Sequence, residues 1–128
     1  SRMLLAYGFL RKVFEVFEKY KTSIDMITTS EVAVSVTIDN ATFLDEIVSE
    51  LKPFGTVEVE QDQTIISIVG DDINFKGDAL TNLFTSLSGI AVSMVSFGGS
   101  TDNISLLVPK QAKLDALKAI NKGMFGLN

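Results

Sequence analysis

One carboxylate, Asp25, is the side chain of this sequence best suited to bind a charged small ligand. It lies between Ile24 and Met26, in a stretch rich in β-branched residues that predicts a strand. A partly desolvated carboxylate on a strand is a natural partner for an ammonium group. The alternative interpretation is an ordinary acidic residue on the exposed face of a sheet.

Two other segments could bind the remaining groups of such a ligand. Gly8-Phe9-Leu10 opens an amphipathic helix. The free N–H groups of a helix start, at the positive end of the helix dipole, suit a carboxylate. Thr28 to Glu31 is a polar turn that offers hydroxyl and carboxylate groups between two predicted strands. Ordinary turn chemistry is the alternative interpretation of both segments.

The elements that hold these residues follow from hydrophobic periodicity. Apolar residues at helical spacing predict helices at 9–20, 44–51, 80–87 and 113–122. Alternating or continuous apolar runs predict strands at 23–28, 32–38, 56–60, 64–69, 90–97 and 103–108. We expect Asp39-Asn40 to cap the second helix. We expect the core to contain Phe14, Phe17, Phe84, Leu114, Leu117 and Ile120.

The pattern occurs twice, with an offset of about 70 residues. Matching pairs of segments are Leu10–Phe14 with Leu80–Phe84, Ile24–Ile27 with Val92–Val95, and Val34–Val36 with Ile104–Leu106. This repeat predicts an α+β fold of two βαββαβ units, residues 1–62 and 63–128, with antiparallel sheets and helices on one face. We expect an incomplete first strand at Met3–Leu5 and no last strand in the second unit, as in a fragment of a longer chain.

Composition excludes several classes of function. The net charge is −5, so a basic surface for nucleic acid is not expected. The chain has no cysteine and no histidine, which removes thiol and imidazole chemistry. Mean hydropathy is +0.30, yet no apolar run approaches the roughly 20 residues of a membrane span. The N-terminus does not resemble a signal peptide, and we expect a cytoplasmic location.

Neither a catalytic site nor a metal site is expected. Phe97-Gly98-Gly99-Ser100 lacks the preceding lysine and the following helix of a phosphate-binding loop. Asp71-Asp72 is typical of a loop or a helix cap. We therefore expect no cofactor in this chain.

Two parts of the sequence resemble the regulatory region of aspartate kinases. Asp25 to Val32 is similar to the strand-and-turn signature of that family's first ACT domain. Val69-Gly70-Asp71 and the segment from Phe97 to Ile104 are similar to its second. The resemblance implies a tandem pair of ACT domains of the lysine-sensitive type, which binds an end-product amino acid and inhibits a kinase domain N-terminal to it. The parent enzyme would phosphorylate aspartate with ATP and Mg.

The resemblance also implies a homodimer and a set of effector-binding residues near its interface: Met3, Ala6, Gly8, Phe9, Leu10, Ser23, Ile24, Asp25, Thr29, Ser30 and Glu31. Lysine would place its carboxylate at Phe9-Leu10 and its side-chain amine at Asp25. Ala6 departs from the family pattern, which has a hydroxyl there, and this bears on the identity of the effector. Ser93 stands at the position of Asp25 in the second unit, so only the first unit is expected to keep the site.

Two alternatives stay open at this point. The first keeps the fold and changes the effector to threonine, as in other aspartate kinases. The second is a dimerisation module without a ligand, which the high apolar fraction and the pairing of sheet edges would suit.

Overall fold

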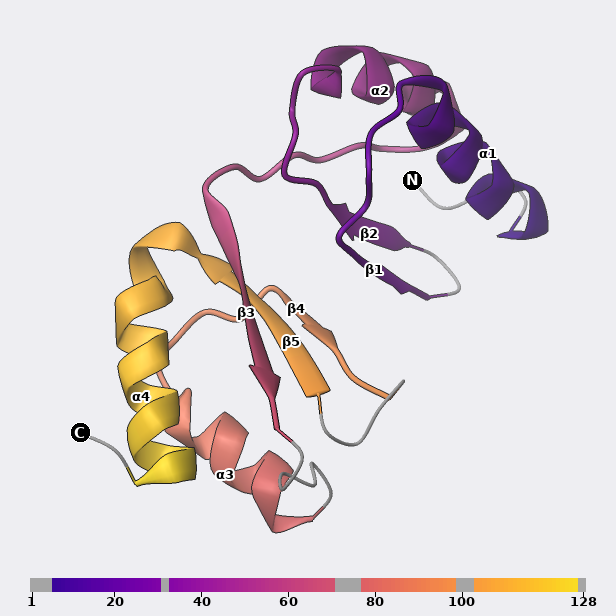
Figure 1. Cartoon of the computed structure of the whole chain (residues 1–128). Coiled ribbons are helices and arrows are strands. Elements are labelled where there is room, and N and C mark those ends of the chain that lie inside the picture. Colours follow the sequence, from indigo (N-terminus) through magenta and orange to yellow (C-terminus); the bar gives the residue numbers. More distant parts are fainter. Residues whose placement is uncertain (1–5, 31–32, 71–76, 99–102, 127–128) are drawn as a thin grey trace. The chain divides into compact units, whose positions relative to one another are not determined.

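A computed structural model describes residues 6–30, 33–70, 77–98 and 103–126, with the backbone alone for Ala6 and Tyr7. The chain divides into two compact units between Val59 and Glu60. The first unit comprises α1 (Ala6–Lys19), β1 (Met26–Thr29), β2 (Val34–Thr37), α2 (Leu44–Leu51) and the 3-10 turn η1 (Lys52–Phe54) (Figure 1). The second comprises β3 (Gln63–Val69), α3 (Asp78–Ser86), β4 (Met94–Ser96), β5 (Asn103–Pro109), the 3-10 turn η2 (Lys110–Ala112) and α4 (Lys113–Phe125).

The second unit is built on a three-stranded sheet in the order β3-β5-β4. Both outer strands pair antiparallel with β5, in registers that include Ile66 with Leu106 and Val95 with Leu106. Strands β3 and β4 therefore run parallel to each other, and α3 connects them as a crossover. This confirms the predicted α+β fold of antiparallel neighbours and helices.

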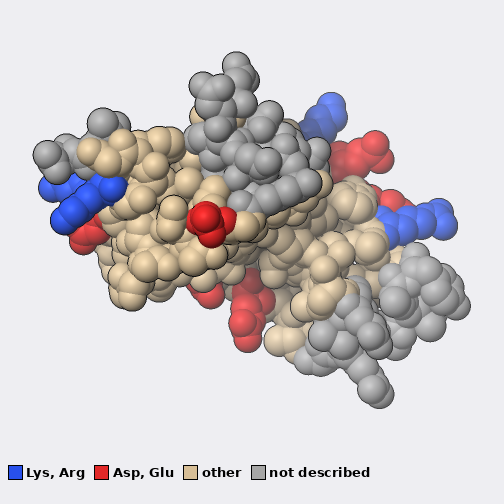
Figure 2. Space-filling view, turned by 90° about the horizontal axis from the view of Figure 1, so that it is seen from below, with Lys and Arg blue, Asp and Glu red and all other residues tan. Residues whose placement is uncertain are grey.

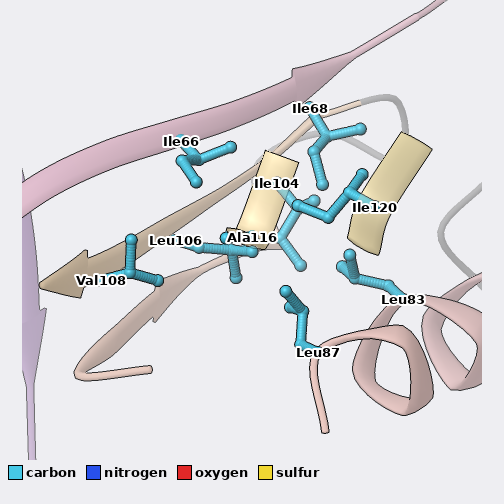
Figure 3. Packing of buried hydrophobic residues seen from close by; sticks show 9 residues of the cluster. All are labelled: Ile66, Ile68, Leu83, Leu87, Ile104, Leu106, Val108, Ala116 and Ile120. Carbon is cyan, nitrogen blue, oxygen red and sulfur yellow. The ribbon is translucent and has the colours of Figure 1, made fainter. Parts of the chain in front are cut away.

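Alternate residues of β3 and β5 form the core of the second unit, together with residues of α3 and α4 (Figure 3). Side chains on one face of β3 and β5 meet those of α3 and α4, and the cluster consists of Ile66, Ile68, Leu83, Leu87, Ile104, Leu106, Val108, Ala116 and Ile120. Full burial of an aliphatic side chain stabilises a fold by about 1.5–3 kcal/mol. This face of the sheet therefore fixes the register of the strands, because a slip by one residue would expose it.

The first unit pairs a hairpin with two helices. Strands β1 and β2 are antiparallel, with a register that runs from Met26 opposite Thr37 to Thr29 opposite Val34. Its core cluster is formed by Val13, Val16 and Phe17 of α1 with Ile47 of α2, and Ile24, Val36 and Ile38 pack against it. Both helices thus bury their apolar faces with residues of the hairpin.

Equivalent residues of the repeat have equivalent burial. Val13 and Leu83 are 2% and 0% exposed, so both fill a core. Phe14 and Phe84, the next residues in each helix, are 48% and 43% exposed. The prediction that these two phenylalanines belong to the core is wrong, because each lies one helical step, about 100°, beyond the inward face.

Several strand predictions differ from the structure. Residues 56–60 alternate as a strand does, but they lie outside both described sheets, since alternation cannot supply a neighbouring strand. Strand β4 covers only Met94–Ser96 of the predicted 90–97, although Ile90 and Val92 still pack against the core. The predicted strand at Met3–Leu5 lies outside the described residues.

Helix α4 is rotated relative to the prediction. Ile120 is buried as expected, but Leu114 is 62% exposed and Leu117 is 36% exposed. Ala116, fully buried, faces the core instead. Gly123 of α4 allows this helix to approach α3 closely. This contact determines which face of α4 turns inward, and the spacing of apolar residues does not reveal it.

The cap of α2 also differs from the prediction. Its N-cap residue is Phe43, and no side-chain hydrogen bond caps the helix. Asn40 instead closes a local turn, because its Oδ1 accepts hydrogen bonds from the amide (3.0 Å) and the hydroxyl (2.6 Å) of Thr42.

In the parts of the chain that the structure describes, no helix has the length and apolar character needed to cross a bilayer.

Candidate functional site

The start of α1 is the predicted contact for a ligand carboxylate. The helix begins at Ala6, three residues earlier than predicted. Counted from Ala6, the first turn of α1 includes Gly8, which is exposed. Phe9 is partly buried and packs against the core cluster, and Leu10 is partly buried as well. Met3 and the side chain of Ala6 lie outside the described residues.

The first turn of α1 also differs in charge from those of the other helices. Acidic side chains lie in the first turn of α2 (Asp45 and Glu46), α3 (Asp78) and α4 (Asp115). In α1 the first turn contains none. Acidic residues at these positions offset the partial positive charge of a helix start. Within the described chain, α1 is thus the helix whose N-terminus stays most favourable to an external anion.

Asp25 lies immediately before β1 and is exposed. Its amide donates a hydrogen bond to the carbonyl oxygen of Thr37 (2.8 Å), and the amide of Met26 donates to Thr37 Oγ1 (2.9 Å). Ser23 is exposed, whereas Ile24 packs against the core cluster. The Asp25 carboxylate is therefore accessible to a ligand on a backbone that β2 holds in place.

The polar turn lies at the other end of the hairpin. Thr29 is the last residue of β1 and is exposed opposite Val34. The amide of Ser30 donates to the carbonyl oxygen of Ala33 (2.8 Å) and closes the turn. Glu31 lies outside the described residues. Thr29 and Ser30 are thus placed together, as the sequence predicted for a hairpin turn.

A single chain does not bring all the predicted contacts together. Helix α1 and strand β1 run in opposite directions (Figure 1). The start of α1 therefore lies toward the Thr29–Ser30 turn, and Asp25 lies toward the end of α1. A helix rises about 1.5 Å per residue, so Gly8 and Lys19 are roughly 16 Å apart along its axis. Gly8 and Asp25 of the same chain therefore lie toward opposite ends of this helix.

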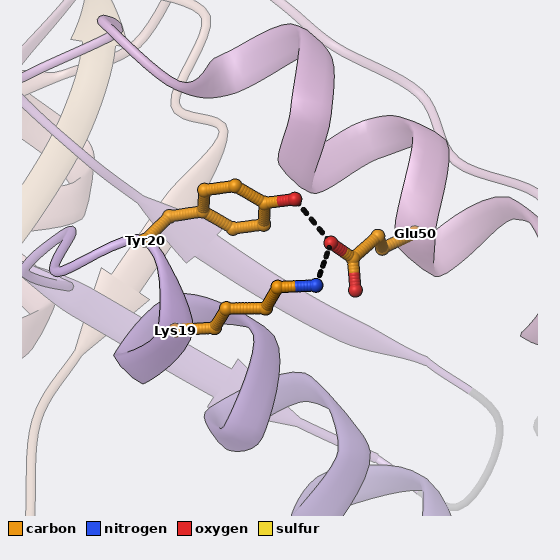
Figure 4. Close-up of polar contacts among 3 residues, drawn as sticks. All are labelled: Lys19, Tyr20 and Glu50. Carbon is orange, nitrogen blue, oxygen red and sulfur yellow. Dashed lines mark hydrogen bonds and ion pairs between the residues drawn. The ribbon is translucent and has the colours of Figure 1, made fainter.

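Sequence reasoning missed a polar cluster at the end of α1 (Figure 4). Lys19 Nζ donates to Glu50 Oε2 (2.7 Å), and the Tyr20 hydroxyl donates to the same oxygen. The Tyr20 ring also contacts Phe43, with ring centroids 5.7 Å apart. Lys19 and Tyr20 are 31 and 30 residues from Glu50 in the sequence, so no local spacing could have revealed the cluster. The cluster fastens the end of α1 to α2.

This cluster also shifts the ionisation of its members. The hydrogen bond from Lys19 lowers the pKa of the Glu50 carboxyl below its ordinary value. The hydrogen bonds to Glu50 raise the pKa of the Lys19 ammonium and that of the Tyr20 hydroxyl. On the face shown in Figure 2, the acidic and basic side chains of the described residues are scattered among uncharged ones.

The chain is similar in sequence and in structure to known proteins. The ACT domain family matches residues 66–124. A solved structure from Porphyromonas gingivalis W83, assigned to the C-terminal regulatory domain of aspartate kinase, is 41% identical, with a TM-score of 0.85 over 97% of this chain and 87% of that one. Aspartokinase 3, chloroplastic, of Arabidopsis thaliana is 38% identical over 98% of this chain and 24% of its own length.

A third relative is known with ligands bound. E. coli aspartokinase III in complex with lysine and aspartate, in its T-state, is 28% identical, with a TM-score of 0.80 over 97% of this chain and 30% of that one. The chain spans about a quarter of the length of the curated relatives that it matches. The match to the P. gingivalis domain extends over nearly all of both chains. The chain therefore belongs to the family of aspartate kinase C-terminal regulatory domains, with an ACT fold.

Proposed function

We propose that this chain is an amino-acid-binding regulatory module that gives feedback inhibition of an aspartate kinase, and that its effector is L-lysine. One observation carries the proposal: α1 has no acidic side chain in its first turn and exposes Gly8 there. Its amides suit the effector's carboxylate. In the proposed whole protein, a kinase domain using ATP and Mg precedes this module, and the enzyme is cytoplasmic.

The effector site lies between two copies of the chain. Gly8 and Asp25 are at opposite ends of α1, so one copy supplies the helix start and the other supplies the carboxylate. A two-fold symmetric dimer would form two such sites, because each copy offers both surfaces. Lysine then stabilises whichever dimer arrangement it binds better, and inhibition follows if that arrangement has an inactive kinase.

Asp25 favours lysine over threonine as the effector. An exposed carboxylate forms a charge-assisted hydrogen bond with a side-chain ammonium, and threonine has none. The E. coli relative crystallised with lysine gives independent support. At the end of β1 that lies toward the start of α1, Thr29 and Ser30 offer hydroxyl groups to the effector's polar groups.

The test is complementation between two variants that fail for different reasons. Gly8→Asp puts a carboxylate at the exposed start of α1, where it favours the helix and repels the effector's carboxylate. Asp25→Asn removes the partner of the amine. Each variant alone should lose lysine binding in calorimetric titration. A mixture of the two, refolded together, should regain one intact site per mixed dimer.

The outcomes separate the alternatives. Recovered binding in the mixture supports a site shared between copies. If the two variants bind no lysine separately and still bind none when mixed, the site is not shared between copies. Binding of threonine instead of lysine would keep the fold and change the effector. A dimer that binds neither amino acid would support a dimerisation module without a ligand.

A further inference from the structure

Strand pairing beside Asp25 contains an irregularity. The amide of Asp25 donates to the carbonyl oxygen of Thr37 (2.8 Å), while the residue in register with Thr37 is Met26. Two successive residues, Asp25 just before β1 and Met26 at its start, thus face one residue of β2. This is the arrangement of a β-bulge, which bends a strand and redirects a side chain.

The second unit contains the same irregularity with different side chains. The amide of Ser93 donates to the carbonyl oxygen of Leu107 (2.8 Å), and Leu107 is in register with Met94. The internal repeat aligns Asp25 with Ser93 and Thr37 with Leu107. The bulge therefore belongs to the fold of both units, whereas the carboxylate and the hydroxyl belong to the first unit alone.

The bulge determines the direction in which Asp25 points. Regular alternation would place Asp25 on the same face as Ile27, whose partner Val36 packs against the core cluster. An unpaired carboxylate on that face would be costly to bury. The extra residue shifts the alternation by one position. Ile24 packs against the cluster in its place, and Asp25 is exposed.

Thr37 holds both residues of this bulge. Its carbonyl oxygen accepts from Asp25, and its Oγ1 accepts from the amide of Met26 (2.9 Å). The equivalent Leu107 of the second unit has no side-chain acceptor for Met94. Both units therefore have the bulge, but only in the first unit does a side-chain hydroxyl, that of Thr37, bind it. This hydroxyl lies next to Asp25, the carboxylate that the bulge exposes.

We propose that Thr37 is a positioning residue for the effector site, and that its hydroxyl fixes the bulge in the conformation that presents the Asp25 carboxylate to an amino-acid ammonium group. The inference rests on the proposed function and extends it to a residue that does not touch the ligand. Loss of the hydroxyl leaves the Met26 amide without this acceptor and loosens the backbone at Asp25, while the carboxylate itself is unchanged.

The test compares lysine affinity, by calorimetry at 25 °C, among variants that circular dichroism shows to be folded. Thr37→Val keeps the shape and removes the acceptor, and should raise Kd about 5- to 10-fold, the value of one hydrogen bond. Thr37→Ser keeps the acceptor and should bind like the natural chain. Ser35→Ala removes an exposed hydroxyl elsewhere in β2, the strand of Thr37, and should leave Kd unchanged. Thr37→Ala replaces Thr37→Val if valine disturbs the hairpin.

Asp25→Asn, titrated in the same series, separates this inference from the proposed function. If Asp25→Asn loses lysine and Thr37→Val does not, the positioning role is wrong and the proposed site stands. If Thr37→Ser is as weak as Thr37→Val, the hydroxyl is not the cause and the inference is again overturned. If Asp25→Asn binds lysine normally, both the proposed site and the inference fail.

Discussion

Gly123 of α4 lies against Ser86 of α3 so closely that a Cβ on Gly123 would stand 2.4 Å from the Ser86 Cβ. Real Cβ atoms do not approach one another to this distance, and the neighbour here is the base of a side chain. The glycine therefore allows the close approach of the two helices that cover the core of the second unit.

Gly123→Ala should destabilise the second unit by about 1–3 kcal/mol, the usual cost of overpacking. Alanine favours a helix over glycine by about 1 kcal/mol, so a loss of stability would be a steric effect. Urea unfolding measures it. Ser86→Gly in the same chain should restore part of the loss, and Asn121→Ala, at an exposed position of α4, should have little effect. A Gly123→Ala variant as stable as the natural chain would contradict the close contact.

Lys21 adopts a left-handed conformation, φ 48°, at the end of α1. Its amide donates to the carbonyl oxygen of Glu18, and the amide of Thr22 donates to that of Phe17, both at 3.0 Å. This is a Schellman motif, whose left-handed position favours glycine. Lys21→Gly should stabilise the first unit by about 0.5–1 kcal/mol, because the relief of strain exceeds the added flexibility of the unfolded chain.

Lys21→Ala is the matched control, since it removes the charge and keeps the Cβ. It should not raise the urea midpoint. A lower midpoint for Lys21→Gly than for Lys21→Ala would show that the strain at this position is too small to matter.

Glu50 should make the stability of the first unit depend on pH. The pKa of Glu50 is lowered in the folded chain, so the ionised carboxylate stabilises the folded state at pH values above 4.5, its ordinary pKa. This stabilisation is lost as the pH falls through the lower pKa of the folded chain. The pKa values of Lys19 and Tyr20 are raised in the folded chain, so their protonated forms stabilise the folded state at pH values below 10.5 and 10.0, their ordinary pKa values. This stabilisation is lost as the pH rises through the raised pKa values. Glu50→Gln should therefore lower the thermal midpoint at pH 7 and have less effect in acid.

Scanning calorimetry from pH 3 to pH 8 measures this difference. Glu18→Gln, which removes a charge from an exposed position of α1, is the control and should follow the natural chain more closely. A Glu50→Gln deficit that stays constant down to pH 3 would mean that packing, rather than the ion pair and the hydrogen bonds, is responsible.

Periodicity predicted those elements whose burial follows from their own sequence. Ile104 to Val108 form a buried strand, and Val13 and Leu83 mark equivalent inward positions of the repeat. Residues 56–60 could not be placed in the same way, because a strand also requires a partner. Leu114 and Leu117 have helical spacing, but contact between helices decided which face of α4 turns inward.

For the candidate site, the sequence offers residue types and leaves the geometry open. The family resemblance distinguishes Asp25 from an ordinary strand carboxylate, yet the exposure of Asp25 depends on a bulge that Thr37 holds, 12 residues further along the chain. The direction of α1 relative to β1 separates Gly8 from Asp25, and only the structure shows this. The proposed sharing of the site between two copies rests on this geometry and not on the periodicity of the sequence.

Titration of lysine and norleucine into the natural chain and into Asp25→Asn tests the central claim most directly. Norleucine has lysine's α-amino and α-carboxyl groups and lacks the side-chain amine. Lysine should bind the natural chain and lose about 10- to 100-fold in affinity on Asp25→Asn, the value of a hydrogen bond to a charged group. Norleucine should bind both chains equally. Equal binding of lysine to both chains would contradict the assignment of Asp25 as the partner of the effector's amine.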